Sequence, residues 1–204
     1  GPRVRMTPST GYWVNGGDQD KALLAAKKYL ACPAGPPDEE DRLANLNLAV
    51  GRMLRLKNLD TQAIPYLIKA VSYSSTVQIS AKTYSELADS YEQGLYAEQS
   101  APYTAKFAGK EETDESKLAL ENIHQVIDRM IDAYARAVAL AADEPGKTEW
   151  MDTLRSFYMF RHNQSDAGLK DLIRTVLYQP LLPLPTPLTS LPPKTPDVAT
   201  PPSP

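Results

Sequence analysis

A regular spacing of small and large apolar residues in the stretch 44–77 constrains the fold of this chain more than any other feature. With residue 44 as position 1, the small residues Gly51 and Ala63 stand at positions 8 and 20, and the large residues Leu54 and Leu67 stand at positions 11 and 24. Small side chains let two helices approach closely, and large ones fill the remaining space between them. The spacing therefore predicts a pair of antiparallel helices joined by a short turn.

Similar offsets recur further along the chain. A second unit over 81–114 carries matching residues at positions 4, 7, 8, 11, 20 and 27, namely Tyr84, Leu87, Ala88, Tyr91, Ser100 and Phe107. Weaker matches cover 111–144, where we expect one continuous helix over 116–142, and 147–178. This pattern resembles the tetratricopeptide repeat (TPR) family, whose repeats are helix pairs of about 34 residues. The resemblance implies an all-α, right-handed helix–turn–helix solenoid of about four helix pairs.

The chain divides into three parts on this view. Residues 1–17 form an irregular arm, residues 18–178 form the solenoid, and residues 179–204 form a proline-rich tail. Asp18 is expected to cap the first helix, and Ser165 is expected to cap the last helix, which ends near Tyr178. The tail favours an extended polyproline II conformation and cannot form a core of its own. We expect its leucines to anchor it in a groove of the body or of a neighbouring molecule, with a plain linker as the alternative; they are Leu181, Leu182, Leu184, Leu188 and Leu191.

Composition limits the possible partners. A formal net charge of −3 gives no electrostatic basis for binding nucleic acid. No apolar run reaches the roughly 18 to 20 residues that span a bilayer, so we expect no membrane-embedded segment. A single cysteine excludes an internal disulfide and a multi-cysteine metal site. Gly1-Pro2 is typical of the residues left by tag removal. Alanine-rich repeats followed by a Leu-Pro tail resemble bacterial envelope proteins, and this resemblance implies a periplasmic or envelope-associated location.

Catalytic chemistry has little support in the sequence. The Glu121-x-x-His124 spacing matches that of di-iron helix bundles, and Met159 stands at the corresponding offset before His162. A solvated or capping histidine is the more common role for such residues. No glycine-rich phosphate loop, nucleophile elbow or metalloprotease helix occurs in the sequence. We therefore expect no enzyme activity, no cofactor and no metal; a histidine paired with a carboxylate inside a cleft would favour an enzyme.

The resemblance also implies a binding surface. In TPR proteins, positions 2, 5, 9, 12 and 13 of the first helix of each repeat line a concave groove. The matching residues here are Asn45, Leu48, Arg52, Arg55, Leu56, Lys82, Ser85, Asp89, Glu92, Gln93, Thr148, Met151, Arg155, Tyr158 and Met159. Arg52 and Arg55 could hold carboxylates of a peptide or helix, although a solvated helix face is the alternative. The lysine and asparagine with which chaperone-binding members clamp a C-terminal carboxylate are absent, because positions 5 and 9 hold Leu48 and Arg52, then Ser85 and Asp89.

These observations lead to two functional hypotheses. The first is a non-catalytic scaffold that binds another protein or peptide in the concave groove. The second is a self-assembly module, in which the proline-rich tail docks on its own groove or on that of a neighbour and so forms a homo-oligomer in the latter case.

Overall fold

In the part that a computed structural model describes, residues 19–31 and 40–191, the chain is mostly helical, and no strand occurs there. The expected all-α class is therefore confirmed. None of these helices combines the length and apolar character needed to cross a bilayer. Residues 1–18, which include the expected cap Asp18, together with Cys32 and the tail beyond residue 191, lie outside the described part. The elements are α2 (Gln19–Leu30), α3 (Glu40–Leu56), α4 (Asp60–Val71), α5 (Ala81–Tyr91), the π-helical η2 (Glu92–Tyr96), α6 (Ala97–Phe107), α7 (Asp114–Leu140), α8 (Lys147–Arg161), α9 (Leu169–Thr175) and the 3-10 helix η3 (Val176–Tyr178).

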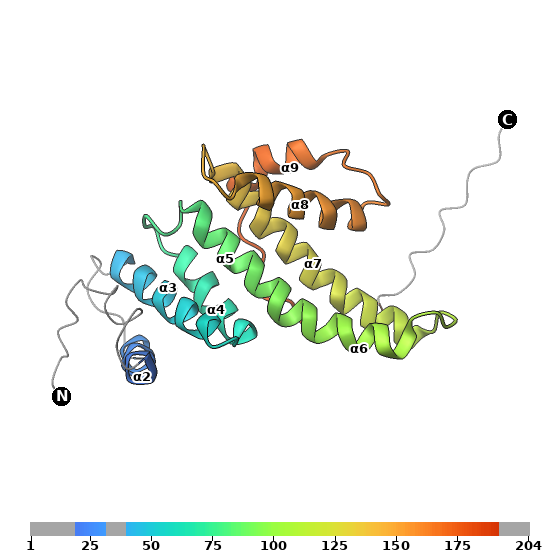
Figure 1. The fold of residues 1–204 in the computed structure, drawn as a ribbon, viewed down its shortest axis with the longest axis horizontal. Helices are drawn as coiled ribbons and strands as arrows, with labels where there is room; N and C mark the ends of the chain where they lie inside the picture. Colours follow the sequence, from blue (N-terminus) through green and yellow to red (C-terminus); the bar gives the residue numbers. More distant parts are fainter. Residues whose placement is uncertain (1–18, 32–39, 192–204) are drawn as a thin grey trace.

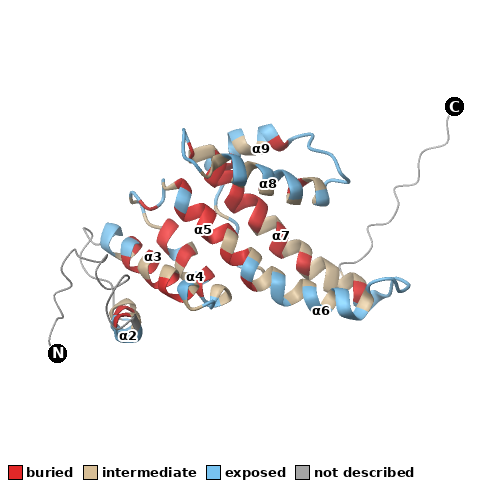
Figure 2. Ribbon diagram, in the orientation of Figure 1, coloured by how far each residue is buried: buried red, intermediate tan, exposed pale blue. Residues whose placement is uncertain are grey.

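The helices pack mainly in the order of the sequence (Figure 1). α2 contacts α3, α3 contacts α4, α4 contacts α5, and α5 contacts α7, while both α8 and α9 pack on α7. Buried residues lie along the faces that these neighbours share, most densely on α5 and the second half of α7 (Figure 2). α6 buries none of its residues. Burial is therefore greatest in the centre of the helical array and decreases toward the end where α6 meets α7.

The close approach of α3 and α4 follows from the residues singled out in the sequence. A Cβ added to Gly51 would lie 2.7 Å from Leu67 Cδ2, which is inside van der Waals contact. Ala63 and Leu67 are fully buried, and Leu54 is 1% exposed. Asn58, with a φ of 57°, adopts the left-handed conformation just after α3, where asparagine is tolerated better than most residues. Small and large residues therefore meet here as the spacing predicts.

The unit expected over 81–114 has no turn. Instead, α5, η2 and α6 form one unbroken helix (Figure 1). The positions that correspond to the turn of the first unit hold Leu95, Tyr96, Ala97 and Glu98, and none of these readily adopts the left-handed conformation that Asn58 uses. Gly94 instead lies within the π-helical segment η2, where an added Cβ would be 2.7 Å from the main-chain nitrogen of Thr61 in α4. The prediction of a helix pair at this place was wrong.

The C-terminal elements agree with the sequence in part. α7 is one continuous helix within two residues of the expected bounds, and it begins with a capping box between Thr113 and Ser116. The last helix starts at Leu169 rather than next to Ser165. Ser165 Oγ accepts a hydrogen bond from the main-chain nitrogen of Ala167, and Gly168, with a φ of 92°, precedes the helix. Ser165 therefore shapes a loop and does not cap α9.

Candidate functional site

A stripe of polar residues follows one side of α7. Asn122, Arg129, Asp132 and Arg136 are separated by seven, three and four residues, which places them on one face of the helix. Residues 179–191 leave η3 as an extended segment and run along this face in the direction opposite to α7. We call the four side chains the α7 stripe.

The C-terminal half of the stripe holds the start of the segment through its main chain. Arg136 Nη2 donates to the carbonyl oxygen of Gln179 at 2.8 Å. The main-chain nitrogen of Leu182 donates to Asp132 Oδ2 at 3.3 Å, and Arg129 Nε donates to the carbonyl oxygen of Pro183 at 2.9 Å. Cationic side chains thus meet carbonyl oxygens, and the carboxylate meets an N–H group.

Asn122 holds the far end of the segment at two points. Its Oδ1 accepts from the main-chain nitrogen of Leu188 at 2.7 Å, and its Nδ2 donates to the carbonyl oxygen of the same residue at 3.2 Å. The second N–H of Nδ2 can donate to the carbonyl oxygen of Leu118, 3.0 Å away. Asn122 and Asp132 are about 15 Å apart along the helix, and Leu182 and Leu188 are about 19 Å apart along an extended chain, so the two spacings differ by about 4 Å.

Asp132 and Arg136 form a buried ion pair at the start of the segment. Their side chains are 10% and 5% exposed, and Arg136 Nε donates to Asp132 Oδ2 at 3.1 Å. The Arg136 guanidinium also lies over the Tyr84 ring, 5.9 Å from its centroid. Burial raises the pKa of Tyr84, and Arg136 offsets part of that rise. A buried ion pair is stable only when its remaining donors and acceptors are hydrogen-bonded, and Gln179 and Leu182 supply two of these bonds.

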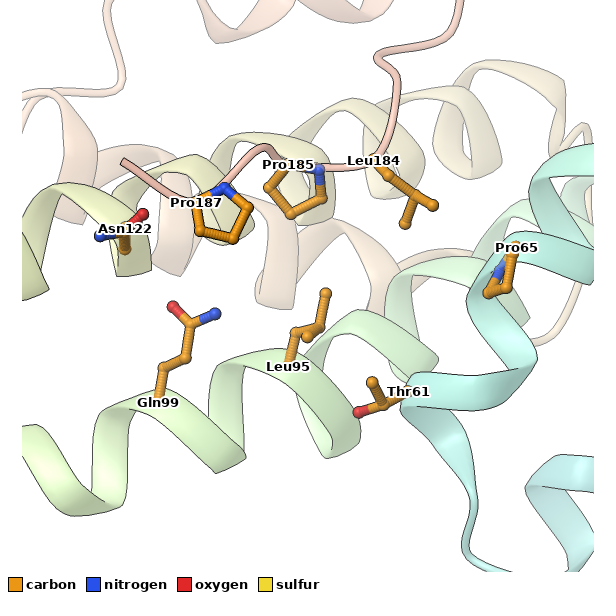
Figure 3. Close-up of a pocket in the computed structure, with 8 residues that line it drawn as sticks. All are labelled: Thr61, Pro65, Leu95, Gln99, Asn122, Leu184, Pro185 and Pro187. Atoms are coloured by element: carbon orange, nitrogen blue, oxygen red, sulfur yellow. The ribbon is translucent and has the colours of Figure 1, made fainter. Parts of the chain in front are cut away.

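A cavity of about 290 Å³ remains between the extended segment and the helices beside it. Its lining comes from α4, η2, α6, α7 and the segment, namely Thr61, Pro65, Leu95, Gln99, Asn122, Leu184, Pro185 and Pro187. Figure 3 shows the Gln99 amide extending toward the segment from the α6 side. Gln99 Oε1 is buried and has no hydrogen-bond partner in the described part of the chain, and the same holds for Nε2 of Gln125. The acceptor capacity of Gln99 beside this cavity is therefore unused.

The leucines of the segment contribute less than the sequence suggests. Leu181 packs against the core, but Leu182, Leu184 and Leu188 keep 38%, 43% and 37% of their surface exposed. Leu191 is partly buried. Main-chain hydrogen bonds to the α7 stripe, with Leu181, are thus the main attachment of the segment.

The arginines predicted to face a ligand are paired within the chain. Arg52 Nε lies 2.8 Å from Glu86 Oε2, and Arg55 Nη2 lies 3.2 Å from Asp89 Oδ2, so both pairs join α3 to α5. Arg55 Nε also lies 3.3 Å from Asp60 Oδ1. These pairs neutralise much of the positive charge that the groove prediction relied on.

Tyr134 of α7 extends this charged network. Its hydroxyl lies 2.9 Å from Asp89 Oδ1 and 3.0 Å from Glu92 Oε2, so it can donate to either carboxylate. Burial and the two neighbouring carboxylates raise the pKa of Tyr134 well above its usual value. Four of the predicted residues, Arg52, Arg55, Asp89 and Glu92, therefore lie on one surface, which we call the α3–α5 face.

The other predicted residues are dispersed. Asn45, Leu56, Lys82 and Gln93 are exposed, whereas Leu48 and Ser85 are buried. Arg155 Nε lies 3.8 Å from Asp166 Oδ2, and the Tyr158 hydroxyl donates to the carbonyl oxygen of Ala167, so both turn toward the α8–α9 loop. Met159 of α8 is partly buried. Thr148 and Met151 line a second cavity of about 400 Å³ bounded by α7, α8 and α9.

None of the α7 stripe was among the predicted site residues. A signal was nevertheless present in the sequence: Asn122, Arg129, Asp132 and Arg136 recur at helical spacing on one face of a long amphipathic helix, and a proline-rich segment follows.

The two histidines contact different neighbours. His124 Nδ1 lies 3.2 Å from Glu121 Oε1, one turn away on α7, and its ring meets the edge of Phe160. His162 is exposed and stacks on Tyr158. Neither histidine lines the two cavities described above, and residues 19–31 and 40–191 contain no cluster of three potential metal ligands.

Two surfaces thus remain as candidate sites, the α7 stripe and the α3–α5 face. The stripe is engaged by main-chain atoms of residues 179–188, and the face is engaged by its own ion pairs. No protein-family model, curated protein or solved structure matches this chain.

Proposed function

We propose that this chain is a non-catalytic protein-interaction scaffold that binds an extended polypeptide segment in the groove between α7 and the helices α4, η2 and α6. The observation that carries the proposal is the α7 stripe, whose hydrogen bonds to the extended segment all go to main-chain atoms. Every polypeptide presents such atoms, so the same side chains suit a segment of another protein.

A TPR-like solenoid is the architecture that we propose for the scaffold. Packing in chain order and the close contact of Gly51 with Leu67 support it. The ion pairs Arg52–Glu86 and Arg55–Asp89 each join residues 34 positions apart, close to the repeat length of that family. The α3–α5 face would then be a second surface for partners, as the resemblance implies.

Self-assembly is the second candidate. The main-chain contacts of residues 179–188 could equally form between the tail of one molecule and the α7 stripe of another. Exposed apolar side chains in η3, just before the tail, favour it, with Leu177 42% and Tyr178 85% exposed. Light scattering across a hundredfold range of protein concentration distinguishes the two candidates, because docking between molecules gives a mass that rises with concentration and docking within one molecule does not.

Hydrogen exchange in the full chain tests the groove. We expect the amide protons of Leu182 and Leu188 to exchange slowly, because they donate to Asp132 and Asn122. Asn122→Ala should release Leu188 and leave Leu182 protected. Asn45→Ala, the same change on α3, should alter neither amide. Rapid exchange of both amides in the unmodified chain would show that the groove does not hold an extended segment and would overturn the proposal.

A further inference from the structure

We infer that the groove along α7 is a binding site for an extended, proline-rich segment of a partner protein, which takes the place of residues 179–191. The partner segment presents N–H groups at two positions six residues apart, tolerates proline between them, and carries a hydrogen-bond donor in its side chain at the place of Pro187. This inference rests on the proposed function and adds the chemistry of the ligand.

The main-chain pattern defines which positions of a ligand can be proline. The α7 stripe accepts N–H groups only from Leu182 and Leu188 within the described part of the tail. Pro183, Pro185 and Pro187 have no N–H, and Pro183 contributes only its carbonyl oxygen. Proline is thus compatible with three positions between the two anchors and incompatible with the anchors themselves.

The unpartnered oxygen of Gln99 shows that the tail satisfies the groove only in part. Gln99 Oε1 is buried without a partner, and the tail presents Pro187, which has no donor, at the edge of the cavity that Gln99 lines. Figure 3 shows Gln99 and Asn122 on either side of this edge, with Pro187 near both. A buried acceptor without a hydrogen bond is unfavourable, so a side chain that supplies a donor here gains affinity.

The weak attachment of the tail allows a partner segment to replace it. Three of its leucines remain more than a third exposed, so little apolar surface holds it in place. The tail has one advantage over a free segment: it belongs to the same chain, and a tethered ligand acts at a high effective concentration. A free segment of equal affinity therefore competes poorly until the tail is weakened.

The experiment weakens the tail in the full chain and supplies the segment as a peptide. Leu188→Pro removes the N–H that Asn122 accepts. Leu188→Ala keeps that N–H and controls for the leucine side chain, while Thr186→Pro adds a proline at an exposed position that makes no hydrogen bond in the described chain. A fluorescent peptide of residues 179–191 is expected to bind the Leu188→Pro chain at least tenfold more tightly than the unmodified and Thr186→Pro chains, as measured by anisotropy. Equal binding to all four chains would overturn the inference.

Two altered peptides test the role of Gln99. A peptide with Pro187→Gln carries a donor, and a peptide with Pro187→Met has similar length without one. We expect the first to bind the Leu188→Pro chain about fivefold more tightly, since one net hydrogen bond is worth about 1 kcal/mol. Adding Gln99→Leu to the chain should abolish the difference between the two peptides. Equal affinity of the two peptides for the Leu188→Pro chain, or a difference that survives Gln99→Leu, would refute the donor requirement.

The results separate this inference from the proposed function. Slow exchange of the Leu188 amide in the unmodified chain, combined with no peptide binding to the Leu188→Pro chain, would leave the groove as a site for its own tail only. Fast exchange in the unmodified chain would instead remove the groove itself.

Discussion

The contact between Gly51 and Leu67 predicts a specific energetic coupling between α3 and α4. A Cβ at position 51 would lie 2.7 Å and 2.8 Å from two carbon atoms of Leu67, whereas carbon atoms normally rest about 3.5–4.0 Å apart. Such overpacking costs about 1–3 kcal/mol. Alanine also favours the helix by about 1 kcal/mol relative to glycine. Gly51→Ala alone should therefore destabilise the chain by about 0–2 kcal/mol.

Removal of the opposing side chain should reverse the sign of this effect. Leu67 is fully buried, and Leu67→Ala alone should cost about 2–5 kcal/mol. In the double variant the added methyl group meets no obstacle and only the helix preference remains. The double variant should therefore be about 1 kcal/mol more stable than Leu67→Ala, which corresponds to a coupling of about 1–3 kcal/mol.

Urea unfolding of the four chains, followed by circular dichroism at 222 nm, measures this cycle. The control is the same cycle with Leu154, which is equally buried but lies on α8. Gly51 lies on α3, which packs on α2 and α4, and Leu154 lies on α8, which packs on α7, so their effects should add within about 0.5 kcal/mol. If Gly51 and Leu67 were also additive, the tight contact would not govern the packing of α3 on α4.

Three further predictions concern other contacts. Gly94→Ala should cost about 2 kcal/mol and lower the melting temperature in calorimetry by about 4–8 °C, because its Cβ would meet the main chain of Thr61 rather than a movable side chain. The pKa of Tyr134 is raised in the folded chain, so its neutral hydroxyl stabilises the fold fully below the usual pKa of 10.0. This contribution to the free energy of unfolding is lost as the pH rises above that value. Urea unfolding at increasing pH should therefore show a smaller alkaline loss of stability in Tyr134→Phe than in the unmodified chain. Arg52→Glu and Glu86→Arg should each cost about 0.5–1 kcal/mol, and the double swap should recover most of it in the same assay.

The sequence predicts local pairing better than it predicts where a helix ends. The α3–α4 unit follows from Gly51 and Leu67, because the two helices are close in sequence and a left-handed Asn58 separates them. The next unit has similar apolar positions but no residue suited to a turn at 95–98, so the helix continues. Apolar spacing alone does not distinguish these cases, since both satisfy the same periodicity.

The candidate site was harder to anticipate than the fold. Asn122 and Arg129 look like ordinary solvated positions on a helix surface. Their role depends on the path of the chain after α9, which brings residue 188 back to residue 122. Similarly, the sequence predicts that Arg52 and Arg55 hold carboxylates of a ligand, because their actual partners Glu86 and Asp89 stand 34 residues away. Contacts over such separations depend on tertiary packing, which the sequence pattern does not contain.

The unbroken helix from Ala81 to Phe107 has a mechanical consequence. At about 1.5 Å per residue it is a stiff rod of about 40 Å. Near one end, Glu86 is tied to α3, and further along, Gln99 lines the cavity beside the extended segment. A partner that tilts this rod at α3 should therefore change the width of the cavity at Gln99, whereas a turn at 95–98 would have let each half move independently.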